Sequence, residues 1–119
     1  MRVKLQKILD RGVPNKERLW LKVLQDTDMR YYIVFDTRYI SQKSISTFPA
    51  HTYWFGPKIV SSGDNVVLGT YKGTYNSKQN TDGTTTHYYY WGNENTIWNN
   101  EGDCAVLFEI SSWETSPYE

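Results

Sequence analysis

The sequence predicts an all-β domain, and three observations indicate this class. Aromatic residues make up 16% of the chain, with ten Tyr, five Trp and four Phe, and such side chains fit the half-buried surface of a β-sheet. Apolar residues recur at every second position in several short segments, as a strand with one buried face requires. Turn-forming residues separate these segments, and no helical period competes with them. The pattern is typical of a sandwich or barrel of about seven or eight strands.

In the first half of the chain, alternation predicts strands over residues 3–9, 18–25 and 30–37. The second of these, RLWLKVLQ, places Leu, Leu and Val on one face and Trp, Lys and Leu on the other. The segment DRGVPNKE contains Gly, Pro and Asn and predicts a turn after the first strand. Residues 38–50 have no clear period and are expected to form an irregular connection.

In the second half, short strands are expected over residues 51–55, 65–71, 86–92 and 104–110. The first stops at a Gly-Pro pair, and SSGD forms a turn before the second. Residues 72–86, KGTYNSKQNTDGTTT, are the most polar stretch and are expected to form a long surface loop.

The length of 119 residues fits a single domain over 1–119, with a core of about 3–110 and a loose tail over 111–119. No run of about 18 apolar residues is present, so no membrane span is expected. The N-terminal segment MRVKLQKILDRG lacks the apolar stretch of a signal peptide. Cys104 is the only cysteine, which excludes an internal disulfide. We therefore expect a cytoplasmic protein.

Charge is balanced overall but unevenly distributed. The formal net charge is zero, which gives no global attraction to nucleic acid or acidic lipid. Basic side chains predominate over residues 2–22, whereas residues 93–119 carry acidic side chains and no Lys or Arg. These regions are either solvated strand faces that attract each other across the fold, or a basic edge that docks on an acidic partner.

Few residues could support catalysis or metal binding. No nucleophile elbow, phosphate-binding glycine loop or His-Glu-x-x-His pair occurs. His51, His87 and Cys104 would supply three zinc ligands, or part of a hydrolase site, if the fold brought them together. Alternatively the histidines are ordinary strand residues and Cys104 is a small buried hydrophobe. The Asn and Asp residues near 82 and 99–103 lack the ligand spacing of a calcium loop. We predict no enzyme, no metal and no cofactor.

The most aromatic stretch is Tyr88, Tyr89, Tyr90 and Trp91. Consecutive side chains on a strand point to opposite faces, so either the first and third or the second and fourth should point away from the core. Exposed aromatic rows stack sugars or bases, or form protein-binding hot spots. The alternative is that a neighbouring loop covers these rings.

Two segments resemble the lamin tail domain family. Tyr90-Trp91-Gly92, followed by Trp98-Asn99-Asn100-Glu101-Gly102-Asp103 with Ala105 and Leu107, is similar to its "YWG … WNN-x-GD-x-A-x-L" signature. Upstream, WFGPKI and SSGDNVVL over residues 54–68 resemble its "F-x-F-P … L-x-x-G-x-x-V-x-V" stretch, and LWLKV resembles its early strand. The chain has RYYIVFDT where the family usually has Gly-Trp, Gln25 where it often has Asn, and no glycine after the last strand.

This resemblance implies an immunoglobulin-like antiparallel β-sandwich of about seven to nine strands and a non-catalytic module. Family members serve in nuclear lamina filaments, where they contact chromatin and other proteins, and bacterial relatives are often attached to secreted or membrane-associated enzymes.

The residues of the WNNEGD segment indicate a structural role. We expect Trp98 to close one end of the core and Gly102 to adopt a dihedral that a Cβ would oppose. Asn99, Asn100 and Asp103 are expected to bond nearby backbone N–H groups and hold the turn.

The last predicted strand, CAVLFEI, is apolar on both faces. Ala105 and Leu107 are expected to face the core. The opposite face consists of Cys104, Val106, Phe108 and Ile110. Such a strand is covered by another part of the chain, here the 72–86 loop or the tail, or by a second chain.

These observations favour a non-catalytic protein-interaction or structural module, in one version self-associating. The expected surface consists of Tyr88, Tyr89, Tyr90, Trp91, Val106, Phe108 and Ile110. The alternative function is carbohydrate or other ligand binding through exposed Tyr and Trp rings. Nucleic acid is not an expected partner, because the basic 2–22 region is offset by acidic residues elsewhere.

Overall fold

The computed structural model describes residues 1–99 and 101–118 and confirms the all-β prediction. All seven predicted runs form strands. They are β1 (Val3–Leu9), β2 (Arg18–Val23), β4 (Tyr32–Ser41), β6 (His51–Trp54), β8 (Asn65–Gly69), β10 (Thr85–Tyr90) and β11 (Asp103–Glu109). The remaining elements are short: β3 (Thr27–Asp28), β5 (Ser44–Ile45), β7 (Ile59–Val60), β9 (Asn76–Gln79) and a 3₁₀ turn, η1 (Met29–Tyr31). Across the described residues, no helix has the length and apolar character to cross a membrane.

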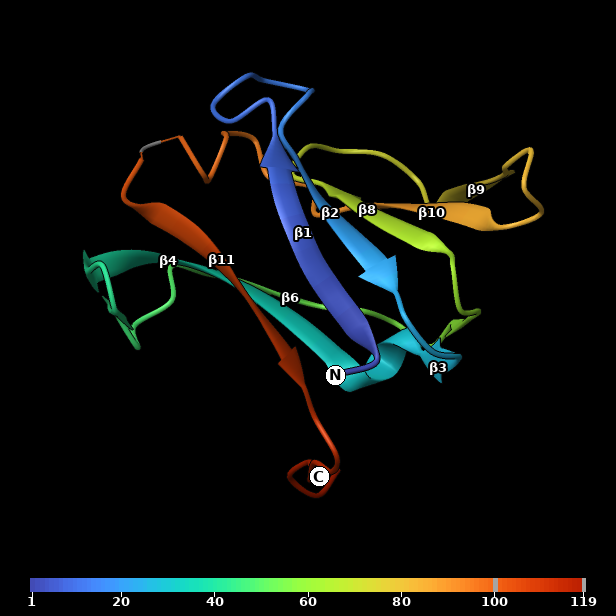
Figure 1. The fold of residues 1–119 in the computed structure, drawn as a ribbon. Coiled ribbons are helices and arrows are strands. Elements are labelled where there is room, and N and C mark those ends of the chain that lie inside the picture. Colours follow the sequence, from blue (N-terminus) through green and yellow to red (C-terminus); the bar gives the residue numbers. More distant parts are fainter. Residues whose placement is uncertain (100, 119) are drawn as a thin grey trace.

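The strands form two main layers of a β-sandwich, which Figure 1 shows from the side of β1 and β11. The larger sheet has five strands in the order β1-β2-β8-β10-β9. The smaller sheet has β4 at its centre, paired with β11 on one side and with β6 and β5 along the other. β3 and β7 form a separate two-stranded sheet.

One pairing departs from the antiparallel arrangement that we predicted. β10 pairs with β8 in parallel, from Thr86 beside Asn65 to Tyr90 beside Gly69. The 72–86 segment makes this possible because it carries the chain back to the starting end of β8 before β10 begins. It is also not a plain loop, since β9 within it pairs with β10 as a hairpin. Figure 1 shows β9 at the far edge of the larger sheet from β11, so this segment does not cover β11.

The core lies between the two sheets and follows the predicted alternation. The larger sheet contributes Leu19, Leu21 and Val23 from β2, Val66 and Leu68 from β8, Tyr89 from β10 and Val3 from β1. The smaller sheet contributes Tyr32, Val34 and Leu107. Trp98 is fully buried, as predicted, and its ring packs against that of Trp91 with centroids 5.7 Å apart. Burying this apolar surface is the main favourable contribution to the fold.

The basic N-terminal and acidic C-terminal regions meet across the fold. The Arg2 backbone N–H donates to Glu109 Oε2 at 3.0 Å, near the end of β11. At the other end of β11, Arg11 donates to the carbonyl oxygens of Trp98 and Asp103. Hydrogen bonds near both ends of β1 therefore connect it to the smaller sheet and stabilise the orientation of the two sheets.

Candidate functional site

The structure separates the predicted aromatic row onto two faces of β10. Tyr89 is only 7% exposed and belongs to the core, and Trp91 packs against the core cluster. Their inclusion in an exposed interaction surface was wrong, because these positions point toward the smaller sheet. Tyr88 and Tyr90 are half-buried and point outward from the larger sheet. The alternation itself was predicted correctly.

Val106 and Phe108 lie on the outer side of the smaller sheet, where strand register gathers a set of apolar side chains. Phe35 on β4 is opposite Val106, and Ile33 is opposite both Phe108 and Trp54. These residues alternate with inward-facing Tyr32 and Val34, so they share the outer face. We call this surface the Phe108 face; it consists of Ile33, Phe35, Trp54, Val106, Phe108 and Trp113.

Packing within the Phe108 face holds its rings in place but leaves those of Trp54, Phe108 and Trp113 exposed. The Phe35 and Phe108 rings lie 4.8 Å apart, and Phe108 remains 42% exposed. The tail contributes Trp113, whose ring meets that of Trp54 edge-on at 5.3 Å. The tail therefore extends this face on one side, and Cys104 at the other end of the strand is buried. The strand positions between them carry no charged side chain: Ile33, Phe35, Thr52, Trp54, Val106 and Phe108.

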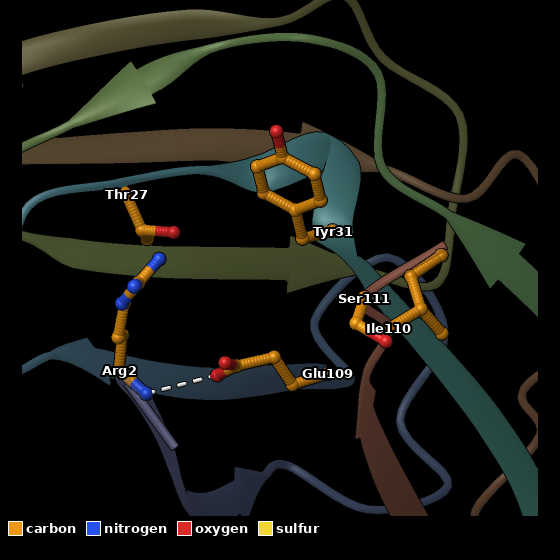
Figure 2. A pocket seen from close by; sticks show the side chains of 6 residues that line it. All are labelled: Arg2, Thr27, Tyr31, Glu109, Ile110 and Ser111. Atoms are coloured by element: carbon orange, nitrogen blue, oxygen red, sulfur yellow. Dashed lines mark hydrogen bonds between the residues drawn. The ribbon is translucent and has the colours of Figure 1, made fainter. Parts of the chain in front are cut away.

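Ile110 lies just beyond β11 and lines a polar pocket of about 320 Å³ (Figure 2). Figure 2 shows Arg2 and Glu109 on one side of this pocket, with the Arg2 side chain directed toward Thr27. Glu109 accepts hydrogen bonds from the Arg2 N–H and from the Tyr32 phenol. The Arg2 N–H, opposed by partial burial and helped by Tyr32, lowers the pKa of Glu109. These two hydrogen bonds connect Arg2 and Tyr32 to the end of β11, which is a structural role.

A second concavity, of about 410 Å³, lies on the outer side of the larger sheet. We call it the tyrosine groove; the lining residues used below are Asp10, Arg18, Gly69, Tyr71, Tyr88 and Tyr90. The outward residues of β2, β8 and β10 form its floor and walls, and the β1–β2 turn forms its rim. Predicted residues Tyr88 and Tyr90 thus lie together here, on a different layer from Val106 and Phe108.

The WNNEGD segment joins the core through Trp98, which is fully buried. Gly102 does not have a positive φ, and a Cβ there would meet nothing within 4 Å, so its predicted dihedral was wrong. Asn99 is exposed, and Asn100 lies outside the described residues. The Gly102 carbonyl accepts a hydrogen bond from the Tyr39 N–H, which connects the turn to β4.

Glu17, which the sequence did not single out, also holds this segment. Its side chain is fully buried, and its carboxylate accepts hydrogen bonds from the backbone N–H groups of Ile97, Trp98 and Gly12, at 2.8, 3.1 and 2.8 Å. A buried carboxylate requires such partners. The sequence near Glu17 does not identify this role, because a Glu after a turn ordinarily lies in solvent. Its partners Ile97 and Trp98 are about eighty residues away in the chain, so only the tertiary fold reveals the contact.

The two histidines do not converge on one site, because each pairs with a different aspartate. His87 is buried, with Nε2 2.9 Å from Asp64 Oδ2 and Nδ1 2.9 Å from Tyr75 Oη. His51 is on β6, with Nδ1 3.0 Å from Asp36 Oδ2. The described residues contain no group of three or more His, Cys, Asp or Glu side chains placed to hold a metal.

The electrostatics of these groups favour structural roles. Burial alone would raise the pKa of Asp64, but its bonds from His87 and from the Thr85 and Ser61 N–H groups outweigh burial and lower it. Burial, followed by the nearby Asp103 carboxylate, raises the pKa of the Cys104 thiol. A raised thiol pKa is the reverse of what a nucleophilic cysteine requires.

The fold and these surfaces define an all-β sandwich with two unlike outer faces, one apolar and one grooved. Comparison with protein-family models, with curated proteins and with solved structures gave no match.

Proposed function

We propose that the protein is a non-catalytic interaction module that self-associates through the Phe108 face. The observation that supports this proposal is the gathering of apolar side chains on three neighbouring strands without an intervening charge: Phe108 and Trp54 are exposed, and Ile33, Phe35 and Val106 are half-buried beside them. Contiguous apolar surface of this kind usually marks an interaction site. The resemblance to the lamin tail family and a cytoplasmic location are part of the same proposal.

A second copy of the chain is the occupant that this face fits best. Two identical apolar faces can meet around a two-fold axis without burying an unpaired charge. The formal net charge of zero means that two copies do not repel each other as they approach. A partner with a charged docking surface would instead lose hydration on this face without gaining an ion pair.

The size of the face sets the expected affinity. A stable interface buries roughly 800 Å² on each partner, whereas the Phe108 face offers six side chains, three of them still half-covered by their neighbours. We therefore expect a weak dimer, with a dissociation constant of about 1–100 μM, in which Phe108 and Trp54 contribute most.

Sedimentation analysis over a range of protein concentrations tests this proposal. The wild-type protein is expected to pass from monomer to dimer, and Phe108→Asp is expected to remain monomeric. Leu24→Asp is the matched control, because Leu24 is similarly exposed (48%, against 42% for Phe108) but lies outside the face. Circular dichroism confirms that each variant is folded. A wild-type protein that stays monomeric, or equal dissociation by both variants, would reject self-association through this face.

A further inference from the structure

We propose that the tyrosine groove is a binding site for a neutral saccharide. The groove is on the outer face of the larger sheet and is independent of the Phe108 face, which belongs to the other layer. Its volume of about 410 Å³ falls within the range of roughly 300–1,000 Å³ that small-ligand sites occupy.

Strand register builds the groove. Arg18 on β2, Gly69 on β8 and Tyr90 on β10 form one row across the sheet. The next outward-facing row places Tyr88 beside Val67, which also lines the groove. Because Gly69 has no side chain, the Tyr71 ring can lie over the middle of the first row, where it forms the floor of the groove. A ligand lying there would be flanked by the Tyr88 and Tyr90 side chains and by the Arg18 guanidinium.

Two glycines fix the aromatic walls. A Cβ on Gly69 would lie 2.9 Å from Cζ of Tyr71, and a Cβ on Gly73 would lie 2.5 Å from Cδ1 of Tyr90. Both rings therefore rest directly on backbone that only glycine permits. They also contact each other edge-on, with centroids 5.7 Å apart. Rings that are fixed in advance lose little conformational entropy when a ligand stacks on them.

Polar groups around the rings suit hydroxyl groups. Arg18 Nη1 is bonded to Asp10 Oδ2 at 2.6 Å and to the Lys16 carbonyl at 2.8 Å, so the pair presents donors and an acceptor side by side. Tyr90 Oη accepts a bond from Asn76 Nδ2 at 3.1 Å, which leaves its own O–H to donate. Burial, and then the neighbouring Tyr90, raise the pKa of Tyr71, so this phenol also keeps its proton at neutral pH.

The charge balance of the groove selects the ligand class. Arg18 is paired with Asp10 at 2.6 Å, so a phosphate or carboxylate at this end of the groove would compete with an existing ion pair, and the other cation of the lining, Lys16, is exposed to solvent. A purely apolar ligand would displace water from the polar groups of the groove without offering them hydrogen bonds, which is unfavourable. A pyranose satisfies both parts of the site, because it carries C–H faces that stack on rings and hydroxyl groups that both donate and accept.

Chemical-shift mapping of the amide groups, with cyclic and acyclic polyols, tests this proposal. The probes are glucose, galactose, mannose, N-acetylglucosamine and lactose, with sorbitol as a control that has hydroxyl groups but no ring face. We expect at least one cyclic sugar to shift the amides of Gly69, Tyr88 and Tyr90, with a dissociation constant of about 1 mM. Sorbitol is expected to cause no such shifts.

Variants locate the binding. Tyr88→Ala is expected to weaken binding at least about tenfold, whereas Tyr88→Phe keeps the ring and most of the affinity. Tyr39→Ala is the matched control, since Tyr39 is exposed on the other sheet. The spectra themselves show whether each variant is folded. The proposal is overturned if no sugar shifts the groove amides, if sorbitol acts equally, if Tyr88→Ala binds like Tyr39→Ala, or if adenosine monophosphate binds there and the sugars do not.

Discussion

The two outer faces of the sandwich carry similar numbers of aromatic rings but differ in what surrounds the rings. On the larger sheet, Tyr88 and Tyr90 share their face with Arg18 and Lys22, and both cations are hydrogen-bonded. On the smaller sheet, the rings of the Phe108 face are surrounded by Ile, Val and Thr. Similar aromatic content therefore gives two chemically different surfaces, and the cross-strand neighbours of each ring make the difference.

The inner sides of the two sheets also differ, in the burial of their His–Asp pairs. Each holds one His–Asp pair, but His87 and Asp64 are both buried, with side-chain exposures of 6% and 7%. In the other pair Asp36 is buried and His51 is 45% exposed. A buried His–Asp pair depends on every hydrogen bond it makes, whereas water can replace a lost partner at a half-exposed pair. The first pair should thus be far less tolerant of substitution.

Removing one aspartate from each sheet gives the largest expected effect. Asp64→Ala leaves His87 Nε2 and the N–H groups of Ser61 and Thr85 without their acceptor, and should lower the free energy of unfolding by about 3–5 kcal/mol. Asp36→Ala should cost only about 1–2 kcal/mol, because His51 stays hydrated. Urea denaturation measures both. Equal losses of unfolding free energy in the two variants would contradict the difference between the two pairs. Glu94→Gln is the control, because Glu94 is exposed and its substitution should leave stability unchanged.

Two glycine substitutions, one beside each sheet, should give the next largest difference in stability. A Cβ on Gly73 collides with the Tyr90 ring, so Gly73→Ala should lower the free energy of unfolding by about 1–3 kcal/mol and reduce saccharide binding. Gly102→Ala, beside the smaller sheet, places its Cβ in open space and should change stability by less than about 0.5 kcal/mol. Thermal unfolding and sugar titration of both variants provide the check. Normal groove binding by Gly73→Ala would show that the ring positions do not depend on this glycine.

These glycines also show how far the sequence could predict the molecule. Local periodicity located all seven main strands, because alternation depends only on which side of a strand is buried. The same periodicity could not decide whether Tyr88 or Tyr89 faces the core, since either choice alternates equally well. Gly73 and Glu17 matter through contacts with Tyr90 and with Ile97 and Trp98, which only the tertiary fold supplies. For the same reason the sequence favoured Gly102, the wrong glycine, on the basis of its motif alone.

Acid titration provides a smaller test of the Asp64–His87 pair. The pKa of Asp64 is lowered in the folded protein, so its stabilisation is fully present above the unfolded value of about 3.9 and is lost as pH falls through the lower folded value. The stability gap between the wild-type protein and Asp64→Asn should therefore be wide at pH 7 and should begin to shrink only as pH falls below about 4. Denaturation curves at several pH values measure this gap. A gap that is constant with pH would mean that the Asp64 charge does not contribute.

Salt and sugar give the smallest expected effects and test whether the two faces act separately. The strand positions of the Phe108 face carry no charge, so raising sodium chloride from about 0.05 M to about 0.5 M should change the dissociation constant of the proposed dimer by less than about twofold. Sodium sulfate should strengthen the dimer, because it favours burial of apolar surface. A saturating saccharide should leave the dimer unchanged, since the groove is on the opposite layer. Sedimentation under these three conditions measures each effect. Strong weakening by sodium chloride would place a charged contact in the dimer, and would move the interface from the apolar face toward the basic and acidic segments that meet at β1 and β11.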